Sequence, residues 1–478
     1  MACRRLVGID LGIASAHTVR VLDETGETVA KRKCWPTTDS LTQIEAAALS
    51  GAEEGTRLEV IMEPTGPAWL PLAVFFASRG HAVFRVSSQK ASDLRKFFSK
   101  HTKTNGIDAD TLARLGIVDR AGLLELVLPD APRAALDRRV RATDRLTTQA
   151  GQHKVRIKDL VRQVLPVSPL AGDLGVADLA MLEHFADPNR LVKAGLKRVT
   201  AVIAKASRNH LGEARAAEWI AAAETSLELY AGHPAVAFAE IAAEIATEVR
   251  LLRAITAELA VHADAREVAY QQVDPAGLAR SLPGLADVGG PALVATLGDP
   301  ARFQRGKQAR SFTGLTPKAS ETGDTDRKGQ SMSKAGSSLL RTTLVRAADT
   351  ARKQDPQLAR IYYVQMVERG KDHLGATCVV AANLAERAWT VLRRGEPYII
   401  RDTDGRAVTS AEATAIIAEH WTVPAEVRAR RRSKKGGKAP HKVLREHVKS
   451  HAQGVDGTRR PSPTTTPARS ATGVKRTA

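Results

Sequence analysis

The first 120 residues alternate between short apolar runs and amphipathic stretches. Short apolar runs bounded by Gly, Pro or Asn predict strands, and apolar positions three or four residues apart predict helices. We therefore expect strands at 5–11, 17–22, 27–34, 58–62 and 81–86. We expect helices at 40–49, 67–79, 91–98 and 108–119. This pattern indicates an α/β domain over residues 1–125.

Residues 126–275 change to Ala-rich and Arg-rich sequence with helical periodicity. Two approximate apolar stripes predict long helices, and they fit either antiparallel coiled-coil arms or a helical bundle. The stripes are Leu136, Val140, Leu146, Ala150, Ile157 and Leu160, and then Ile241, Ile245, Val249, Leu252 and Leu259. Dimerisation through these helices is an expectation, and amphipathic helices with a solvated charged face are the plainer interpretation.

Residues 276–400 predict a mainly α-helical C-terminal domain. Within it, PGLADVGGPALVATL has the pattern of a helix-hairpin-helix, whose glycine-bearing turn would present backbone N–H groups to a DNA phosphate. An ordinary helical hairpin fits equally well. From Val427 to Ala478, 15 Lys and Arg stand against Glu446 and Asp456, which predicts a disordered basic tail.

Composition points to a polyanionic partner. The chain has 478 residues and a formal net charge of +19, and a chain this basic most often meets nucleic acid or an anionic membrane surface. No apolar run is long enough to span a membrane, and the N-terminus lacks the apolar core of a signal peptide. Cys3, Cys34 and Cys378 are widely separated, which disfavours a disulfide framework or a zinc site and fits a reducing cytoplasm.

Two predicted strands end in an acid. VGIDLG places Asp10 at the end of the first strand, between glycines that allow a backbone or a phosphate to come close, and VIMEPTG places Glu63 at the end of the fourth. Three consecutive strands followed by strand–helix alternation is the order of ribonuclease H-like folds, in which the first and fourth strands are neighbours. Asp10 and Glu63 would then meet, and carboxylates this close favour Mg²⁺ or Mn²⁺ between them. Two such ions could clamp a phosphodiester.

A third stretch, TKTNGIDADTLARL, carries Asp108 and Asp110 at a predicted helix start. Positions i and i+3 share a helix face, whereas i and i+2 diverge by about 200°. Asn105 and Asp108 could therefore face one metal ion, but Asp108 and Asp110 could not. A structural interpretation is also open, with Asp108 as the N-cap and Asp110 as a first-turn acid.

Together these stretches resemble the DEDD-type insertion-sequence transposases, whose N-terminal domain is similar to the RuvC junction resolvase. The match continues with LPGLADVGGPALVATLGDPARFQRGKQARSFTGLTP, SETG and MSKAGSSLLRTTLVRAA, and it covers roughly residues 5–120 and 280–390. The resemblance makes Asp10, Glu63 and Asp108 catalytic metal ligands. The family's Asp–x–x–Asp pair reads Asn105 and Asp108 here, so the fourth ligand is the Asn105 amide, the Asp110 carboxylate or water.

The resemblance also implies a serine nucleophile in GLTPKASETGDTDRKG. Ser320 and Thr322 compete for this role, and Ser320 is preferred because a primary hydroxyl is less hindered. A purely structural interpretation is that both hydroxyls only cap turns. Basic residues near the two motifs are expected to bind nucleic acid. They are Lys103, Arg327, Lys328, Lys334 and Arg341.

The function implied is transposition: metal-dependent DNA cleavage and strand exchange at element ends and target, guided by a structured RNA that the element encodes. The partners implied are DNA, that RNA and further copies of the chain, as a dimer or tetramer, in a bacterial-type cytoplasm at the nucleoid and without a membrane. One alternative is an inactive or non-catalytic DNA-binding relative, which Asn105 favours. The other is an actin-like ATPase or kinase, since GIDLG also opens that fold, but no second phosphate loop is evident.

Overall fold

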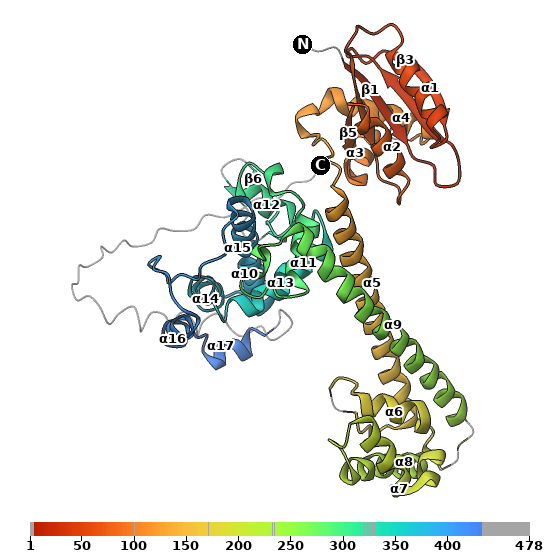
Figure 1. Cartoon of the computed structure of the whole chain (residues 1–478), viewed down its shortest axis with the longest axis vertical. Coiled ribbons are helices and arrows are strands. Elements are labelled where there is room, and N and C mark those ends of the chain that lie inside the picture. The colour runs from red at the N-terminus through yellow and green to blue at the C-terminus, as the bar shows by residue number, and fades with distance from the viewer. Residues whose placement is uncertain are drawn as a thin grey trace, which may run out of the picture. The chain divides into compact units, whose positions relative to one another are not determined.

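The computed structural model describes residues 4–432, except residues 100, 171, 232, 234, 320, 323–324 and 327–329. The chain divides into two compact units, Met1–Ala135 and Leu136–Ala478 (Figure 1). The first unit holds the five-stranded sheet, and the second is built mainly from helices. Each unit is described by itself.

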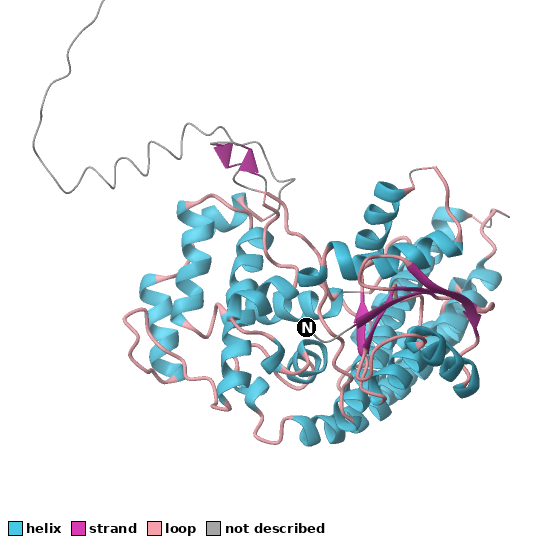
Figure 2. Ribbon diagram, turned by 90° about the horizontal axis from the view of Figure 1, so that it is seen from above, coloured by secondary structure: helices cyan, strands magenta, loops and turns pink. Residues whose placement is uncertain are grey.

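The N-terminal unit contains one twisted sheet (Figure 2). Its strand order is β3-β2-β1-β4-β5. Its strands are β1 (Arg4–Asp10), β2 (His17–Leu22), β3 (Thr28–Cys34), β4 (Arg57–Met62) and β5 (Ala82–Arg85). Strand β1 pairs antiparallel with β2 and parallel with β4, and β4 pairs parallel with β5. The expected neighbourhood of the first and fourth strands is confirmed, and the mixed sheet fits a ribonuclease H-like domain.

Four helices cover the two faces of this sheet: α1 (Thr38–Leu49), α2 (Trp69–Ser78), α3 (Ser88–Phe98) and α4 (Asn105–Val118). Successive strand residues point to opposite faces. Val7 and Ile9 of β1 share a buried cluster with residues of α1 and α2, whereas Leu6 packs with Ala113 of α4. The even-numbered side of β1 therefore faces α4, and this side ends in Asp10.

Helix α4 lies unusually close to β1 because Gly8 has no side chain. A Cβ on Gly8 would stand 1.9 Å from the carbonyl oxygen of Ala109 and 2.4 Å from the backbone nitrogen of Ala113. Small residues on the helix continue this contact, since a Cβ on Gly116 would stand 2.6 Å from Cδ2 of Leu6. The expectation that Gly8 admits another backbone is confirmed, and the partner is α4.

The start of α4 corrects one sequence interpretation. The helix begins at Asn105, three residues before the expected start at Asp108. Its N-cap is Thr104, whose hydroxyl accepts a hydrogen bond from the Ile107 backbone N–H at 3.2 Å. Thr104 can cap because Ser and Thr hydroxyls satisfy the free N–H groups of a first turn. Asp108 is therefore not the N-cap, and it lies one turn inside the helix.

The second unit begins with the rest of a long helix and a small bundle. Its first helices are α5 (Ala131–Val164), α6 (Val176–Phe185), α7 (Pro188–Ala206), α8 (Glu213–Tyr230) and α9 (Phe238–Val273). The C-terminal part of the first expected stripe meets the second stripe in one buried cluster, where Ile157 of α5 lies with Val249 and Leu252 of α9. Leu136 and Val140 belong to a different buried cluster. Glu248 of α9 is buried and contacts His153 at 2.5 Å and Arg156 at 3.0 Å, both on α5.

The rest of this unit packs around a second buried cluster, which includes Leu136, Tyr270, Leu344 and Val380. Its helices are α10 (Leu278–Ser281), α11 (Gly289–Leu297), α12 (Gly306–Phe312), α13 (Ser338–Ala351), α14 (Pro356–Tyr363), α15 (His373–Arg394), α16 (Ser410–His420) and α17 (Ala425–Arg430). Short helical turns of this unit lie at η2 (Pro300–Arg302) and η3 (Val364–Glu368), and another, η1 (Arg120–Gly122), belongs to the first unit. The segment interpreted as a helix-hairpin-helix, residues 283–297, forms a turn and α11, and α10 ends just before it.

Between α12 and α13 the chain leaves the helical body as a paired arm, residues 314–334. Its two sides are joined by backbone hydrogen bonds from Lys318 N to Ser331 O, from Ser333 N to Thr316 O and from Lys334 N to Gly314 O, at 2.9 to 3.1 Å. Farther out, β6 (Glu321–Thr322) pairs with β7 (Thr325–Asp326). At the base, Arg341 Nη1 donates to the carbonyls of Thr313 and Lys334, each at 3.3 Å.

Several remaining expectations can be located in the structure. Cys34 and Cys378 are buried free thiols. In the described part of the chain, no helix is long and apolar enough to cross a membrane. The basic tail expected from Val427 overlaps α17, and Val427 packs against the second cluster. Residues 433–478 lie outside the described residues.

Candidate active site

Asp10 and Glu63 lie side by side at one edge of the sheet. Ile9 pairs with Met62 in the parallel ladder, so the next residue on each strand is an acid at the same level. Ile61 packs with Leu112 of α4, so alternation along β4 puts Glu63 on the α4 side as well. The close contact at Gly8 then places Asp108, one residue before Ala109, beside the same edge.

The three carboxyl groups are electrostatically coupled. Burial raises the pKa of Asp10 above its ordinary value of 3.8, and the nearby Asp108 and Glu63 raise it further, whereas Lys103 acts in the opposite direction. All three acids are partly accessible to solvent. A carboxyl whose pKa is raised by neighbouring acids favours a cation or a proton beside it.

A cavity of about 210 Å³ opens beside these acids. Glu63 and Asp108 line it together with Arg95 and Lys103, which bring positive charge. Its remaining lining residues are Ser88, Ala91, Ser92, Thr111 and Leu112. The Arg95 Nε lies 3.4 Å from Oδ1 of Asp108, and the two side chains are equally exposed, at 22% each.

Glu59 lies on the same face of the sheet and is an acid with a purely structural role. Its carboxylate is buried and pairs with Arg4 at 3.2 Å and with Arg120 at 2.8 Å. Buried charges need such partners because desolvation is costly. The contact of Asp108 with Arg95, at 3.4 Å, is longer than both ion pairs of Glu59.

Asp110 and Asn105 take different positions on α4. The carboxylate of Asp110 pairs with Arg114 one turn further on, at 2.7 Å, and it is neither in the cavity lining nor among the groups that shift the pKa of Asp10. Asn105 is the exposed first residue of α4. It is three residues before Asp108 and so shares its helix face. The structure therefore groups Asp10, Glu63 and Asp108 and leaves Asp110 outside that group.

The residues expected to act from the C-terminal arm are only partly described. Ser320, Arg327 and Lys328 lie outside the described residues, and the backbone of Thr322 belongs to β6. Lys334 is exposed and adopts a left-handed backbone conformation with φ 54°. The guanidinium of Arg341 bridges the two carbonyls at the base of the arm, which gives this side chain a structural contact.

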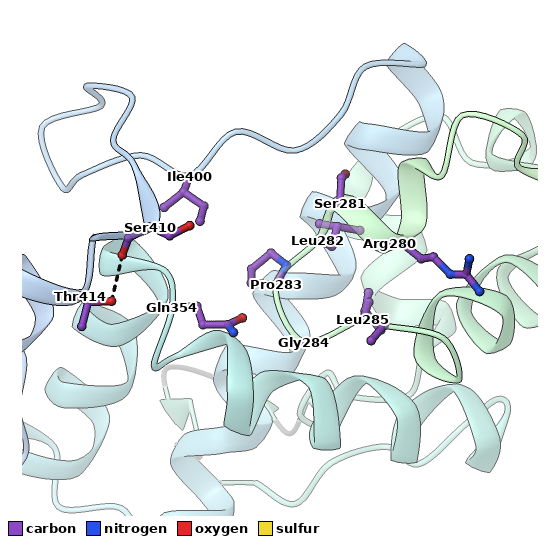
Figure 3. Close-up of a pocket in the computed structure, with 11 residues that line it drawn as sticks. Arg280, Ser281, Leu282, Pro283, Gly284, Leu285, Gln354, Ile400, Ser410 and Thr414 are labelled. Atoms are coloured by element: carbon purple, nitrogen blue, oxygen red, sulfur yellow. Dashed lines mark hydrogen bonds between the residues drawn. The ribbon is translucent and has the colours of Figure 1, made fainter. Parts of the chain in front are cut away.

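The second unit contains a separate cavity of about 400 Å³ beside the turn between α10 and α11. Figure 3 shows Leu282, Pro283 and Gly284 on one side and Ser410 and Thr414 of α16 on the other. Its charged residue Arg280 is tied to Glu267 of α9. The lining includes no acidic residue, in contrast to the edge of the sheet.

The acid group fits a hard divalent cation by its chemistry. Carboxylate oxygens are the ligands that Mg²⁺ and Mn²⁺ prefer, and Asp108 and Glu63 raise the pKa of Asp10, so positive charge is favoured beside Asp10. Within the described ranges, no three acidic, His or Cys side chains converge tightly enough to hold an ion as they stand. Binding would therefore require the carboxylates to draw together and Arg95 to leave Asp108.

Comparison with known proteins agrees with this geometry. A family model of the DEDD IS110 type, described as “Transposase”, matches residues 7–166, which include the sheet and all three acids. A second model, described as “Transposase IS116/IS110/IS902 family”, matches residues 276–363, which include the arm. The two matches together cover about half of the chain. The chain belongs to the IS110-type transposase family.

One curated relative is a protein of Sinorhizobium fredii (strain NBRC 101917 / NGR234) named “Putative transposase y4pF/y4sB”. It is 31% identical over 133 residues, which are 27% of this chain and 33% of that protein. The match thus spans about a third of the length of the relative. The DEDD-type resemblance inferred from the three N-terminal motifs is confirmed.

One residue beside the three acids was not foreseen from the sequence. Arg95 comes from α3, and it reaches Asp108 only because α3 packs against α4. It reads locally as an ordinary basic residue in the last turn of a helix, where positive charge is favoured. A local pattern carries no signal for such a contact between two helices.

Proposed function

We propose that this protein is an active transposase that cuts and rejoins DNA at the ends of an insertion sequence and at its target. The observation that carries the proposal is the group formed by Asp10, Glu63 and Asp108 beside a cavity lined by Arg95 and Lys103. Acids that couple to each other next to basic side chains suit a phosphodiester, whose charge the cations can balance.

Asp10, Glu63 and Asp108 would hold Mg²⁺ or Mn²⁺, with the Asn105 amide as a candidate further ligand on the same face of α4. When bound, the ion would lower the energy of negative charge on phosphate oxygens and favour the alkoxide form of an attacking hydroxyl. Lys103, whose charge acts to lower the pKa of Asp10, would hold the DNA backbone beside the acids. Asp110 is kept apart by Arg114 and is not needed in this arrangement.

Ser320 would be the nucleophile, with Thr322 as the competing hydroxyl. Its oxygen would bond to phosphorus while the bond from phosphorus to a deoxyribose oxygen breaks. The hydroxyl proton would pass to a base, and the leaving oxygen would take up a proton. The product would be a covalent serine–DNA phosphodiester that a DNA hydroxyl later resolves. This requires the arm and an acid group to meet at one phosphate, within one chain or between two copies.

The resemblance extends the proposal to partners. A structured RNA encoded by the element would pair with donor and target DNA, and the basic residues Arg327, Lys328 and Lys334 would bind nucleic-acid backbones. The formal net charge of +19 supports contact with several phosphate groups. The turn between α10 and α11 would contact a DNA backbone, and the paired helices α5 and α9 would join copies into a dimer or tetramer.

A second candidate function has one observation in its favour. Asn105 stands where the family motif usually has an acid, and it brings no charge to the site. A chain that binds DNA without cutting it would account for this residue. Such a protein would bind the element ends but would form no covalent link and require no divalent ion.

The decisive experiment incubates the purified full chain with Mg²⁺ and a junction DNA carrying the element ends, and follows covalent protein–DNA adducts and joined strands. Asp10→Ala and Ser320→Ala are each expected to abolish joined strands, while Asp110→Ala and Thr322→Ala retain them as matched controls. Unchanged activity in Asp10→Ala would refute the metal site. Loss in Thr322→Ala but not in Ser320→Ala would move the nucleophile, and ATP turnover would favour the kinase-like alternative.

A further inference from the structure

Arg95 is the basic side chain that the structure places directly on the acid group. Its Nε faces Oδ1 of Asp108 at 3.4 Å, and its Nη2 donates to the Ser92 hydroxyl at 3.5 Å. Both serines of the cavity wall, Ser88 and Ser92, lie on the same helix α3 at positions one turn apart. The long contact distances leave the guanidinium weakly held, so it can exchange one partner for another.

Neighbouring basic residues show that the position of Arg95 beside Asp108 is not required by helix α3 itself. Lys96 occupies the same last turn of α3, where it also complements the helix dipole, and it pairs outward with Asp93 at 4.0 Å. Arg114 pairs with Asp110 on the far side of α4 at 2.7 Å. Only Arg95 and Lys103, among the described basic residues, line the cavity of about 210 Å³.

The charges around this cavity would be rearranged by a divalent ion. At present Arg95 pairs with the carboxylate of Asp108, and the charge of Lys103 acts on Asp10. An arriving ion would repel Arg95 and compete with it for Asp108, since both bind the same oxygen atoms. A guanidinium released into a cavity with two serine hydroxyls has the planar donor geometry that suits a phosphate group.

We propose that Arg95 is a built-in counter-ion of the acid group, which leaves Asp108 when a divalent cation binds and then contacts a phosphate of the bound nucleic acid. This inference rests on the proposed metal-dependent function and adds a residue to it. In the metal-free protein, Arg95 thereby offsets part of the repulsion among the three carboxylates. Binding of the ion and binding of the phosphate become linked through one side chain.

The test measures Mn²⁺ affinity of the full chain by calorimetry, without nucleic acid, in Arg95→Gln, Arg95→Lys and the matched control Arg114→Gln. Arg95→Gln is expected to bind Mn²⁺ about three- to tenfold more tightly, because a competing positive charge is removed. Arg95→Lys keeps the charge and is expected to stay within about twofold of the parent protein, as is Arg114→Gln. Melting temperatures check that each variant is folded.

A second measurement follows binding of a short single-stranded DNA as salt is varied, with Ca²⁺ to support binding and then with EDTA. Loss of one phosphate contact is expected to reduce the slope of log affinity against log salt by about one in Arg95→Gln. The reduction should be present with Ca²⁺ and absent with EDTA, because Arg95 then stays on Asp108. A purely structural role would lower both affinities equally in Arg95→Gln and Arg95→Lys.

The outcomes separate this inference from the function on which it rests. If the parent protein binds Mn²⁺, Asp10→Asn abolishes binding, and Arg95→Gln binds no more tightly, the role of Arg95 is wrong and the metal site stands. If the parent protein binds no Mn²⁺ at all, the metal-dependent function fails, and the inference fails with it. Tighter Mn²⁺ binding together with the Ca²⁺-dependent change of slope supports both.

Discussion

Replacing Gly8 by alanine is expected to push helix α4 away from strand β1. The new methyl group would meet the Ala109 carbonyl oxygen at 1.9 Å and the Ala113 nitrogen at 2.4 Å. A carbon atom normally stays about 3.3–3.6 Å from a carbonyl oxygen, so the helix must retreat by about 1.5 Å. Both clashing atoms belong to the backbone, and no side-chain rotation relieves them.

This displacement of α4 is expected to lower both the stability of the protein and its rate of strand transfer. Overpacking a core typically destabilises by about 1–3 kcal/mol, and the fixed backbone partners place Gly8→Ala at the upper end, which for a unit of this size lowers the melting temperature by roughly 10 °C. Asp108 moves with the helix. A misplacement of about 1 Å at a reacting centre can cost about 100-fold in rate, so strand transfer should fall by a similar factor.

The matched control is Gly116→Ala, on the face of α4 that packs against β1. Its Cβ would meet Cδ2 of Leu6 at 2.6 Å, but that atom is the end of a flexible side chain, and alanine improves the helix by about 1 kcal/mol. Calorimetric melting and Mn²⁺ titration of the full chain should therefore separate the two variants. A Gly8→Ala protein that melts within about 2 °C of its parent and binds Mn²⁺ equally well would refute the close-packing argument.

Three further predictions follow from the site and the helical unit. Asn105→Asp adds a charge on the Asp108 face of α4, and it should tighten Mn²⁺ binding while lowering the melting temperature of the ion-free protein. Asp10→Asn should abolish activity yet raise the ion-free melting temperature at neutral pH. The pKa of Asp10 in the folded protein lies above its ordinary value of 3.8. Asp10 therefore contributes stability to the fold below pH 3.8, and this contribution is lost as the pH rises through the folded pKa. The stability gained by Asp10→Asn should accordingly shrink as the pH falls toward 3.8. Burial acts to raise the pKa of Glu248, but hydrogen bonds from His153 and Arg156 prevail and hold it below its ordinary value of 4.5; Glu248→Gln should cost about 1–3 kcal/mol in denaturant unfolding at pH 7 and progressively less as the pH falls below 4.5.

The sheet and its acid edge could be predicted because they depend on local patterns. Apolar runs set the strands, and the element order indicated that β1 and β4 are neighbours, which put Asp10 beside Glu63. The start of α4 was misplaced because Thr104 and Asp108 are both good capping residues, and only the backbone geometry decides between them. That shift of three residues matters little for Asp108, whose helix face stays the same.

Contacts between elements far apart in the sequence were harder to predict. Arg95 meets Asp108 through the packing of α3 on α4, and Glu248 meets His153 across two long helices. The small bundle of α6, α7 and α8 was not resolved into helices in advance. Ala-rich sequence has weak amphipathic contrast, and buried alanines such as Ala216, Ala222 and Ala223 read like exposed ones.

The paired arm at residues 314–334 constrains how relatives of this protein can vary. Its two sides leave the helical body already in register, and Arg341 holds the carbonyls at its base. Adding one residue to one side alone would turn every following side chain to the opposite face. Length changes should therefore come as matched insertions near the tip, and an arm bounded at Gly314 and Lys334 could be exchanged between relatives as a cassette without disturbing the helices that carry it.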